Sequence, residues 1–234
     1  MVDEQTLGIR AQQVLHDKKW QKFLPRAGVF RYLPFVEFAF AAGSLAMGNV
    51  REDSDFDVIV GVRRGRMFNA RFFAVAFFGL PGWRRKKLSH DRSARDKICL
   101  NHFVTEKSYR LAPPYNEYWR DLYRSLVPIF GSREVILKFW RANADWMGDA
   151  PAYADDLRHR YRANAWPARL LETMLSGRLG ERLEHWFKRL QIHLIERGLP
   201  RHAASYKPRI RFGDDELEFH PDTKRTELYN PVGS

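Results

Sequence analysis

The chain has 234 residues, of which 44% are apolar and 14% aromatic, so it is too apolar for a disordered protein and long enough for one large or two small domains. Its single cysteine, Cys99, excludes an internal disulfide framework and a cysteine-cluster zinc site. Forty Lys and Arg against 28 Asp and Glu give a net charge of +12, which indicates an anionic partner such as nucleic acid, a nucleotide or a lipid surface.

The first half of the chain alternates between helical and strand patterns. Apolar residues recur at helical spacing near the N-terminus, and runs rich in Phe, Val and Ile follow between turns. In chain order the patterns predict a helix at 4–26, a strand at 29–42, a strand at 55–62, a helix at 67–80 and a strand at 98–105.

The second half is predominantly helical. The patterns predict helices at 115–127, 133–147 and 167–197, the last interrupted near Gly177 and Gly180, then a loop-like tail with one short hairpin around Gly213. We therefore expect an α/β domain over residues 1–112 and a mostly helical domain with an irregular tail over residues 113–234.

We expect a cytoplasmic protein with no membrane attachment. The N-terminus lacks the basic start and apolar run of a signal peptide. Of the two most apolar stretches, 32–47 is interrupted by Glu37, and 72–80 is far shorter than the roughly 20 residues that a spanning helix needs.

The strongest chemical pattern lies between Gly43 and Asp57. Gly43-Ser44 ends a predicted strand, and such a turn can offer backbone N–H groups and a hydroxyl to a phosphate. Asp55 and Asp57 are two residues apart at the start of the next strand, so both carboxylates point to one face. Mg²⁺ commonly binds one or two carboxylates together with substrate phosphates, so the pattern favours metal-assisted phosphoryl or nucleotidyl transfer.

Gly-Ser, a spacer of ten residues and Asp-x-Asp before an aliphatic strand resemble the signature of the polymerase-beta-like nucleotidyltransferase superfamily, in its minimal form. The resemblance covers residues 35–61. It implies an α+β fold in which a small mixed β-sheet with helices on one face precedes a helical C-terminal region. It also implies that Gly43 and Ser44 bind the triphosphate and that Asp55 and Asp57 bind Mg²⁺ or Mn²⁺. Nucleoside monophosphate would pass from a nucleoside triphosphate to a hydroxyl acceptor, releasing pyrophosphate.

The superfamily usually places a third acidic residue on a neighbouring strand. Here the centre of the predicted strand at 98–105 carries Asn101, which can ligate a metal but cannot accept a proton. Two carboxylates are alternatives, Asp96 before the strand and Glu106 after it. By alternation we expect Cys99 on the same face as Asn101, as a buried apolar residue, and His102 on the opposite face, as a core residue.

The densest basic segment is Arg84-Arg85-Lys86-Lys87, which precedes the third strand and is a candidate nucleic-acid-binding surface. Three functions remain open from the sequence. They are a metal-dependent nucleotidyltransferase acting on RNA, a nucleotidyltransferase that modifies a protein hydroxyl, and a nucleotidyltransferase-fold nucleic-acid-binding protein without catalysis. RNA explains the net charge most directly, whereas Asn101 favours the last of the three.

Overall fold

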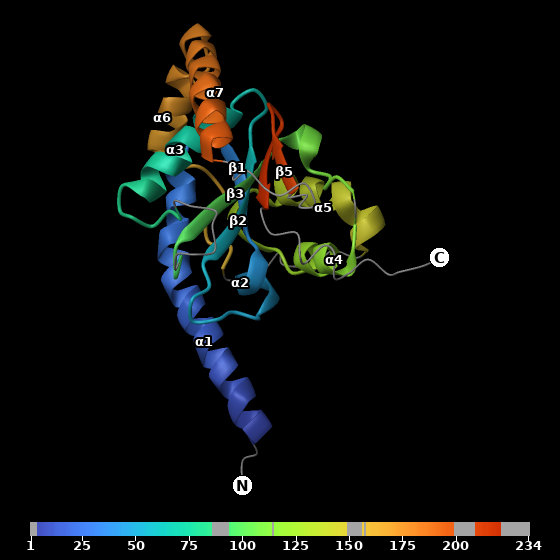
Figure 1. Cartoon of the computed structure of the whole chain (residues 1–234). Coiled ribbons are helices and arrows are strands. Elements are labelled where there is room, and N and C mark those ends of the chain that lie inside the picture. The colour runs from blue at the N-terminus through green and yellow to red at the C-terminus, as the bar shows by residue number, and fades with distance from the viewer. Residues whose placement is uncertain are drawn as a thin grey trace.

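A computed structural model describes residues 4–85, 94–113, 115–148, 156, 158–198 and 209–220. Its centre is a six-stranded mixed sheet with the order β4-β1-β2-β3-β6-β5 (Figure 1). The strands are β1 (Val36–Ala41), β2 (Phe56–Val62), β3 (Ile98–Val104), β4 (Val127–Gly131), β5 (Arg209–Phe212) and β6 (Glu216–His220). The predicted α+β class is confirmed.

Helices connect and cover these strands. They are α1 (Glu4–Ala27), α2 (Gly43–Met47), α3 (Met67–Gly79), α4 (Glu117–Arg124), α5 (Arg133–Met147), α6 (Trp166–Met174) and α7 (Arg178–Gly198), with short 3₁₀ helices η1 (Gly28–Tyr32) and η2 (Glu106–Ser108). Strand β1 runs antiparallel to β2, and β2 runs parallel to β3, so α3 lies within the crossover that a parallel pair requires.

The helices predicted in the first half of the chain cover one face of the sheet. Phe23 of α1 and Phe78 of α3 are fully buried against Val58 and Val60 of β2, within one apolar core. Helix α7 lies against α3, where the rings of Phe72 and Phe187 stack with centroids 4.0 Å apart.

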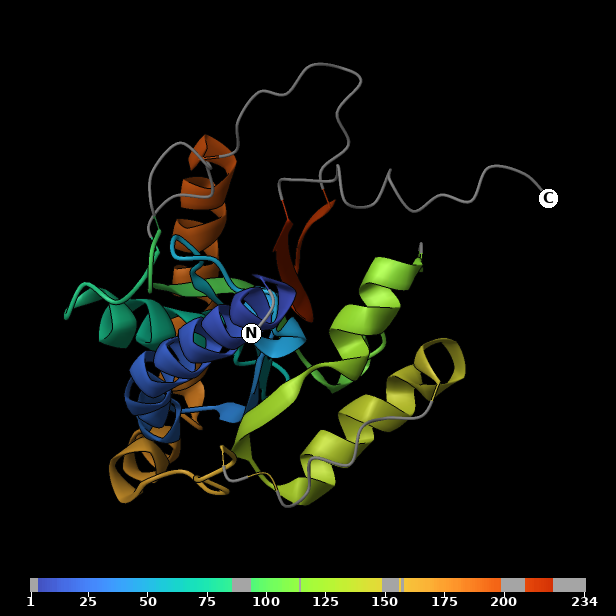
Figure 2. The same cartoon turned by 90° about the horizontal axis from the view of Figure 1, so that it is seen from below.

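The opposite face is covered by α4 and α5, so the sheet has helices on both faces rather than on one (Figure 2). Phe38 and Phe40 of β1 pack on that face against Trp119 of α4 and Phe139 of α5. The prediction of helices on one face is correct for α1 and α3, which come from the first half of the chain. The helices that cover the second face, α4 and α5, both follow residue 112.

Three strands of the sheet also lie beyond residue 112. Strand β4 pairs with β1 at one edge, and the hairpin of β5 and β6, predicted around Gly213, pairs with β3 at the other side. The helix predicted at 115–127 ends earlier, and Val127 begins β4. Pro128 has no N–H to donate to a partner strand, which suits the edge position of β4.

Within the part of the chain that the structure describes, no helix is both long enough and apolar enough to cross a membrane.

Candidate metal and nucleotide site

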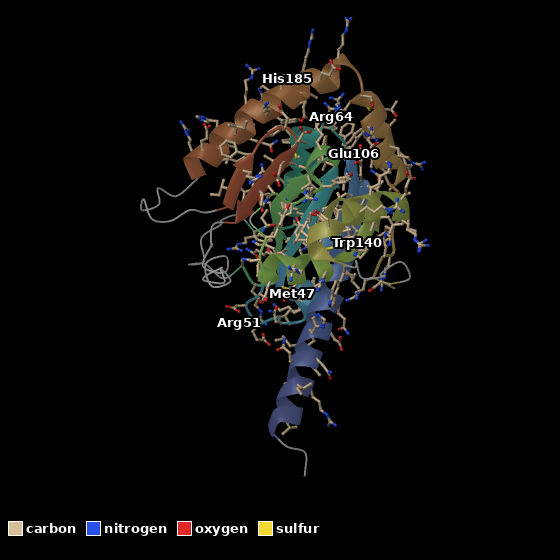
Figure 3. All side chains as sticks on the ribbon, turned by 90° about the vertical axis from the view of Figure 1, so that its right-hand side faces the viewer. Met47, Arg51, Arg64, Glu106, Trp140 and His185 are labelled. Carbon is tan, nitrogen blue, oxygen red and sulfur yellow. The ribbon has the colours of Figure 1, made fainter. Side chains whose placement is uncertain are left out.

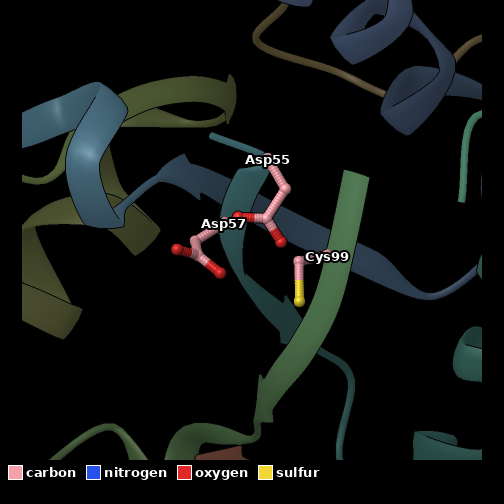
Figure 4. Close-up of side chains that lie close together, drawn as sticks. All are labelled: Asp55, Asp57 and Cys99. Carbon is pink, nitrogen blue, oxygen red and sulfur yellow. The ribbon is translucent and has the colours of Figure 1, made fainter. Parts of the chain in front are cut away.

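The Asp-x-Asp carboxylates lie at the start of β2, next to the start of β3. Asp57 is the second residue of β2 and Asp55 directly precedes the strand, while Cys99 is the second residue of β3 and the register partner of Asp57. One carboxylate oxygen of each Asp and Sγ of Cys99 lie within 4.8 Å of one another, a group that could hold a metal ion (Figure 4).

The predicted phosphate turn lies directly against this carboxylate pair. Gly43 has a φ of +59°, and a Cβ placed on it would lie 2.2 Å from Oδ2 of Asp57. Only glycine fits here, because any other residue would be strained in this left-handed backbone conformation and its Cβ would clash with the carboxylate of Asp57. Ser44 follows in α2 and is half-buried. The turn and the Asp pair, eleven or more residues apart in sequence, are therefore one local site.

Asn101 occupies the position predicted for the third polar group. Its side chain is 8% exposed, and Nδ2 donates a hydrogen bond of 3.3 Å to Oδ1 of Asp57. The amide therefore orients the carboxylate of Asp57 without adding charge. Neither candidate replacement joins the group that surrounds Asp55 and Asp57.

Asp96 lies beside the loop that precedes Asp55, where its backbone N–H donates to the carbonyl of Ser54. Its carboxylate pairs with Lys19 at 2.8 Å and with Lys22 at 2.7 Å, both on α1. Glu106 lies in η2, beyond the far end of β3, and Figure 3 places it near Arg64, away from Met47 of α2. The hypothesis that one of these two carboxylates completes the site is therefore not supported by their positions.

The prediction that His102 faces away from Asn101 is wrong. Asp57 pairs with Cys99 but Ile59 pairs with His102, so β3 contains one extra residue opposite this part of β2. Such a shift lets two consecutive side chains reach the same face. Asn101 contacts Asp57, and His102 lies on that same face because its partner Ile59 belongs to the core beneath α4 and α5.

Cys99 has the environment of an unreactive thiol. It is 4% exposed, and burial together with the carboxylates of Asp57 and Asp55 raises its pKa well above the usual value. A protonated thiol is a poor ligand for Mg²⁺, which prefers oxygen. The donors suited to Mg²⁺ or Mn²⁺ are thus the two carboxylates and the carbonyl oxygen of Asn101.

Arg85 brings a positive charge into the site from the predicted basic segment. Its Nη1 lies 2.7 Å from Oδ2 of Asp55, and both side chains are largely buried. The backbone N–H of Arg85 donates to the carbonyl of Ile98, which fixes this end of the segment beside β3. Burial lowers the pKa of neighbouring Arg84. Lys86 and Lys87 lie outside the described residues.

Helix α1 fixes the loop that leads into Asp55. Nζ of Lys19, on a residue that is 2% exposed, donates to the carbonyls of Glu52 and Ser54 as well as to Asp96. Burial tends to raise the pKa of Asp96, but the hydrogen bonds from Lys19 and Lys22 outweigh it and leave the pKa below its usual value. The lysine thus ties both the loop before β2 and the segment before β3 to α1.

We expect Lys19→Met to lower the free energy of unfolding by about 3 kcal/mol, because it leaves the carbonyls of Glu52 and Ser54 without this donor and removes one of the two lysine partners of the partly buried Asp96 carboxylate. Lys22→Met, at a half-exposed partner of the same carboxylate, should cost less than about 1 kcal/mol.

Since the folded pKa of Asp96 is lowered, its stabilisation is present above the unfolded pKa and is lost as pH falls through the folded value. Urea unfolding from about pH 5 to about pH 3 should therefore show a weaker pH dependence in Lys19→Met. Equal losses in both variants would contradict this role of Lys19.

A second group of potential ligands was missed from the sequence. His102 of β3 lies with Glu216 and Glu218 of β6, and one donor atom of each lies within 4.8 Å of the others. The alternation of the two Glu residues indicates one strand face, but only the pairing of β6 with β3 brings them to His102.

An open pocket lies at the opposite end of β2 and β3 from the Asp pair, lined in part by Arg64, Lys107, His185 and Asp214. Charges of both signs meet there, and Lys188 pairs with Asp214 at 2.6 Å. We place the candidate site at the carboxylates rather than at this pocket, because the pocket brings together no group of metal ligands among its described residues.

Comparison of the chain with protein-family models, curated proteins and solved structures finds no match.

Proposed function

We propose that this protein is a metal-dependent nucleotidyltransferase that moves a nucleoside monophosphate from a nucleoside triphosphate to a hydroxyl acceptor. The observation that carries the proposal is the contact between the Gly43 turn and the carboxylate of Asp57, with Asp55 beside it. A phosphate-type turn and two carboxylates on one strand face are the parts that metal-assisted transfer of a phosphoryl group requires.

The residues present fit a hard divalent cation. Asp55 and Asp57 would hold Mg²⁺ or Mn²⁺, and Asn101 would orient Asp57 through its amide. When bound, such an ion supplies Lewis-acid polarisation of the phosphoryl oxygens. Gly43 and Ser44 would bind the triphosphate through backbone N–H groups and the Ser44 hydroxyl.

In the proposed reaction the acceptor oxygen forms a bond to the α-phosphorus, and the bond from that phosphorus to the bridging oxygen of the β-phosphate breaks. Pyrophosphate leaves with the electron pair of the broken bond. The proton of the acceptor hydroxyl passes to solvent, because the Asn101 amide cannot accept it.

RNA is the acceptor that we propose, because a net charge of +12 favours a polyanion. Transfer to a protein hydroxyl is the alternative outcome of the same assay. Incubation with α-labelled nucleoside triphosphates, Mg²⁺ or Mn²⁺, and total RNA or lysate tests the reaction. Label that ribonuclease removes supports RNA, and label that only protease removes overturns the RNA assignment.

A second function, nucleotide and nucleic-acid binding without catalysis, is favoured by one observation. The third position of the site is Asn101, while Asp96 is held by Lys19 and Lys22, and Glu106 lies in η2. This function predicts that a labelled nucleoside triphosphate binds in the presence of Mn²⁺ but that no acceptor becomes labelled. Label in any acceptor would contradict it.

Arg85 should compete with a metal ion for Asp55, because its guanidinium already neutralises that carboxylate at 2.7 Å. We expect Arg85→Gln to bind Mn²⁺ without nucleotide about tenfold more tightly than the wild type. Removal of a positive charge this close to the carboxylate should make the binding free energy of the cation more favourable by on the order of 1.4 kcal/mol or more. Titration followed by the electron paramagnetic resonance signal of free Mn²⁺ measures this. Arg84→Gln is the matched control, and an unchanged affinity in Arg85→Gln would contradict competition.

A further inference from the structure

A second cluster of metal-ligand side chains lies on the same face of the sheet, one strand further along. His102 of β3 and Glu218 of β6 are direct register partners, and Glu216 lies two residues away on β6. Directly opposed residues of an antiparallel pair, and residues two apart on one strand, project to one face. The backbone pairing therefore brings all three side chains together.

The distances between the donor atoms suit a single small cation. Nε2 of His102 lies 3.5 Å from Oε1 of Glu216, and one donor from each of the three residues lies within 4.8 Å of the others. Two ligands at about 2.1 Å from a tetrahedral ion are separated by about 3.4 Å. Small side-chain rotations would thus bring the third donor to the same ion.

The burial of the cluster makes an added positive charge favourable. Glu218 is fully buried and His102 is 2% exposed, so a carboxylate and an imidazole are held away from solvent on two paired strands. Glu216 is more accessible and lies 3.7 Å from the guanidinium of Arg211, whose side chain is nearly half exposed. Arg211 faces the carboxylate of Glu216 from the solvent side, and a cation bound between the three side chains would interact strongly with both carboxylates, because burial limits the screening of their charges by water.

We propose that His102, Glu216 and Glu218 bind one divalent transition-metal ion. An imidazole nitrogen with two carboxylate oxygens is a donor set suited to Zn²⁺ and related ions, whereas Mg²⁺ favours oxygen alone. This site is separate from the carboxylate pair, which offers Asp55, Asp57 and a protonated thiol. The bound ion joins β6 to β3 and so fastens the C-terminal hairpin to the sheet.

Zn²⁺ binding to the full chain in excess Mg²⁺, followed by competition with a chromophoric chelator, tests this site. We expect one equivalent of Zn²⁺ to bind to the wild type. His102→Gln and Glu218→Gln should each weaken binding by at least about 100-fold. Asp55→Asn with Asp57→Asn, and Glu106→Gln as a carboxylate outside the cluster, should retain it.

A further variant and a further measurement test the site even if a variant of a buried residue folds poorly. Glu216→Gln alters the accessible ligand and should also weaken Zn²⁺ binding, and Zn²⁺ should raise the Tm of the wild type more than that of each cluster variant. Absence of stoichiometric Zn²⁺ binding would overturn the proposal. So would binding that the three cluster variants leave unchanged, or binding that is lost only when Asp55 and Asp57 are replaced.

Discussion

Replacement of Asp55 and Asp57 together by Asn should reduce nucleotidyl transfer by at least about 10³-fold, corresponding to a loss of about 4 kcal/mol of transition-state stabilisation. The carboxylates are the anionic oxygen donors beside the Gly43 turn, and the amides that replace them carry no charge to hold a divalent ion. Initial rates of label transfer at saturating Mn²⁺ measure the effect, together with Mn²⁺ affinity in the absence of acceptor.

Asp53→Asn is the matched control, because Asp53 belongs to the same acidic stretch but its side chain is 67% exposed and pairs with Arg51 on the surface. It should leave the transfer rate within about twofold of the wild type. Label transfer that survives the double replacement of Asp55 and Asp57 would contradict the proposed mechanism.

Gly43→Ala should lower the free energy of unfolding by about 3 kcal/mol and abolish nucleotide binding. Its Cβ would lie 2.2 Å from Oδ2 of Asp57, so the carboxylate must leave the position in which Asn101 holds it, and the φ of +59° disfavours any side chain. Urea unfolding and nucleotide titration measure the two effects.

Gly48→Ala separates the backbone penalty from the clash. Gly48 has a φ of +78° at the end of α2, and a Cβ there would have nothing within 4 Å. We expect it to cost about 1 kcal/mol and to leave nucleotide binding intact. Equal effects of the two substitutions on nucleotide binding would mean that contact with Asp57 is not what Gly43 provides.

The parts of the fold that local patterns determine were predictable from the sequence. The helix α1, the strands β2 and β3 and the helix α5 follow apolar periodicity and their flanking turn residues, and their observed bounds lie within about two residues of the predicted ones. Strand β4 was missed because Val127 continues a helical apolar pattern and Pro128 is unusual in a strand.

The site was predictable where it is local in sequence and was missed where it depends on strand pairing. The Gly-Ser turn and the Asp pair share one short segment, and Asn101 was found because strand alternation indicates a face. The extra residue in β3 moves His102 to the same face as Asn101, and only the pairing of β3 with β6 brings Glu218 to His102. Neither the extra residue in β3 nor the pairing of β3 with β6 can be predicted from the residues of a single strand.

The partner of Arg85 was missed for a similar reason. A run of basic residues before a strand indicates a solvated surface, yet the backbone bond from Arg85 to Ile98 turns this residue toward Asp55. The same positive charge that suggested a nucleic-acid surface is therefore partly used within the carboxylate site.

The most direct measurement is a crystal structure of the protein soaked with Mn²⁺ and a non-hydrolysable nucleoside triphosphate, with the anomalous signal of the metal recorded. We predict Mn²⁺ within about 2.2 Å of carboxylate oxygens of Asp55 and Asp57, with the triphosphate against Gly43 and Ser44. Mn²⁺ or nucleotide bound elsewhere, with the Arg85 guanidinium still paired to Asp55, would contradict the proposed function.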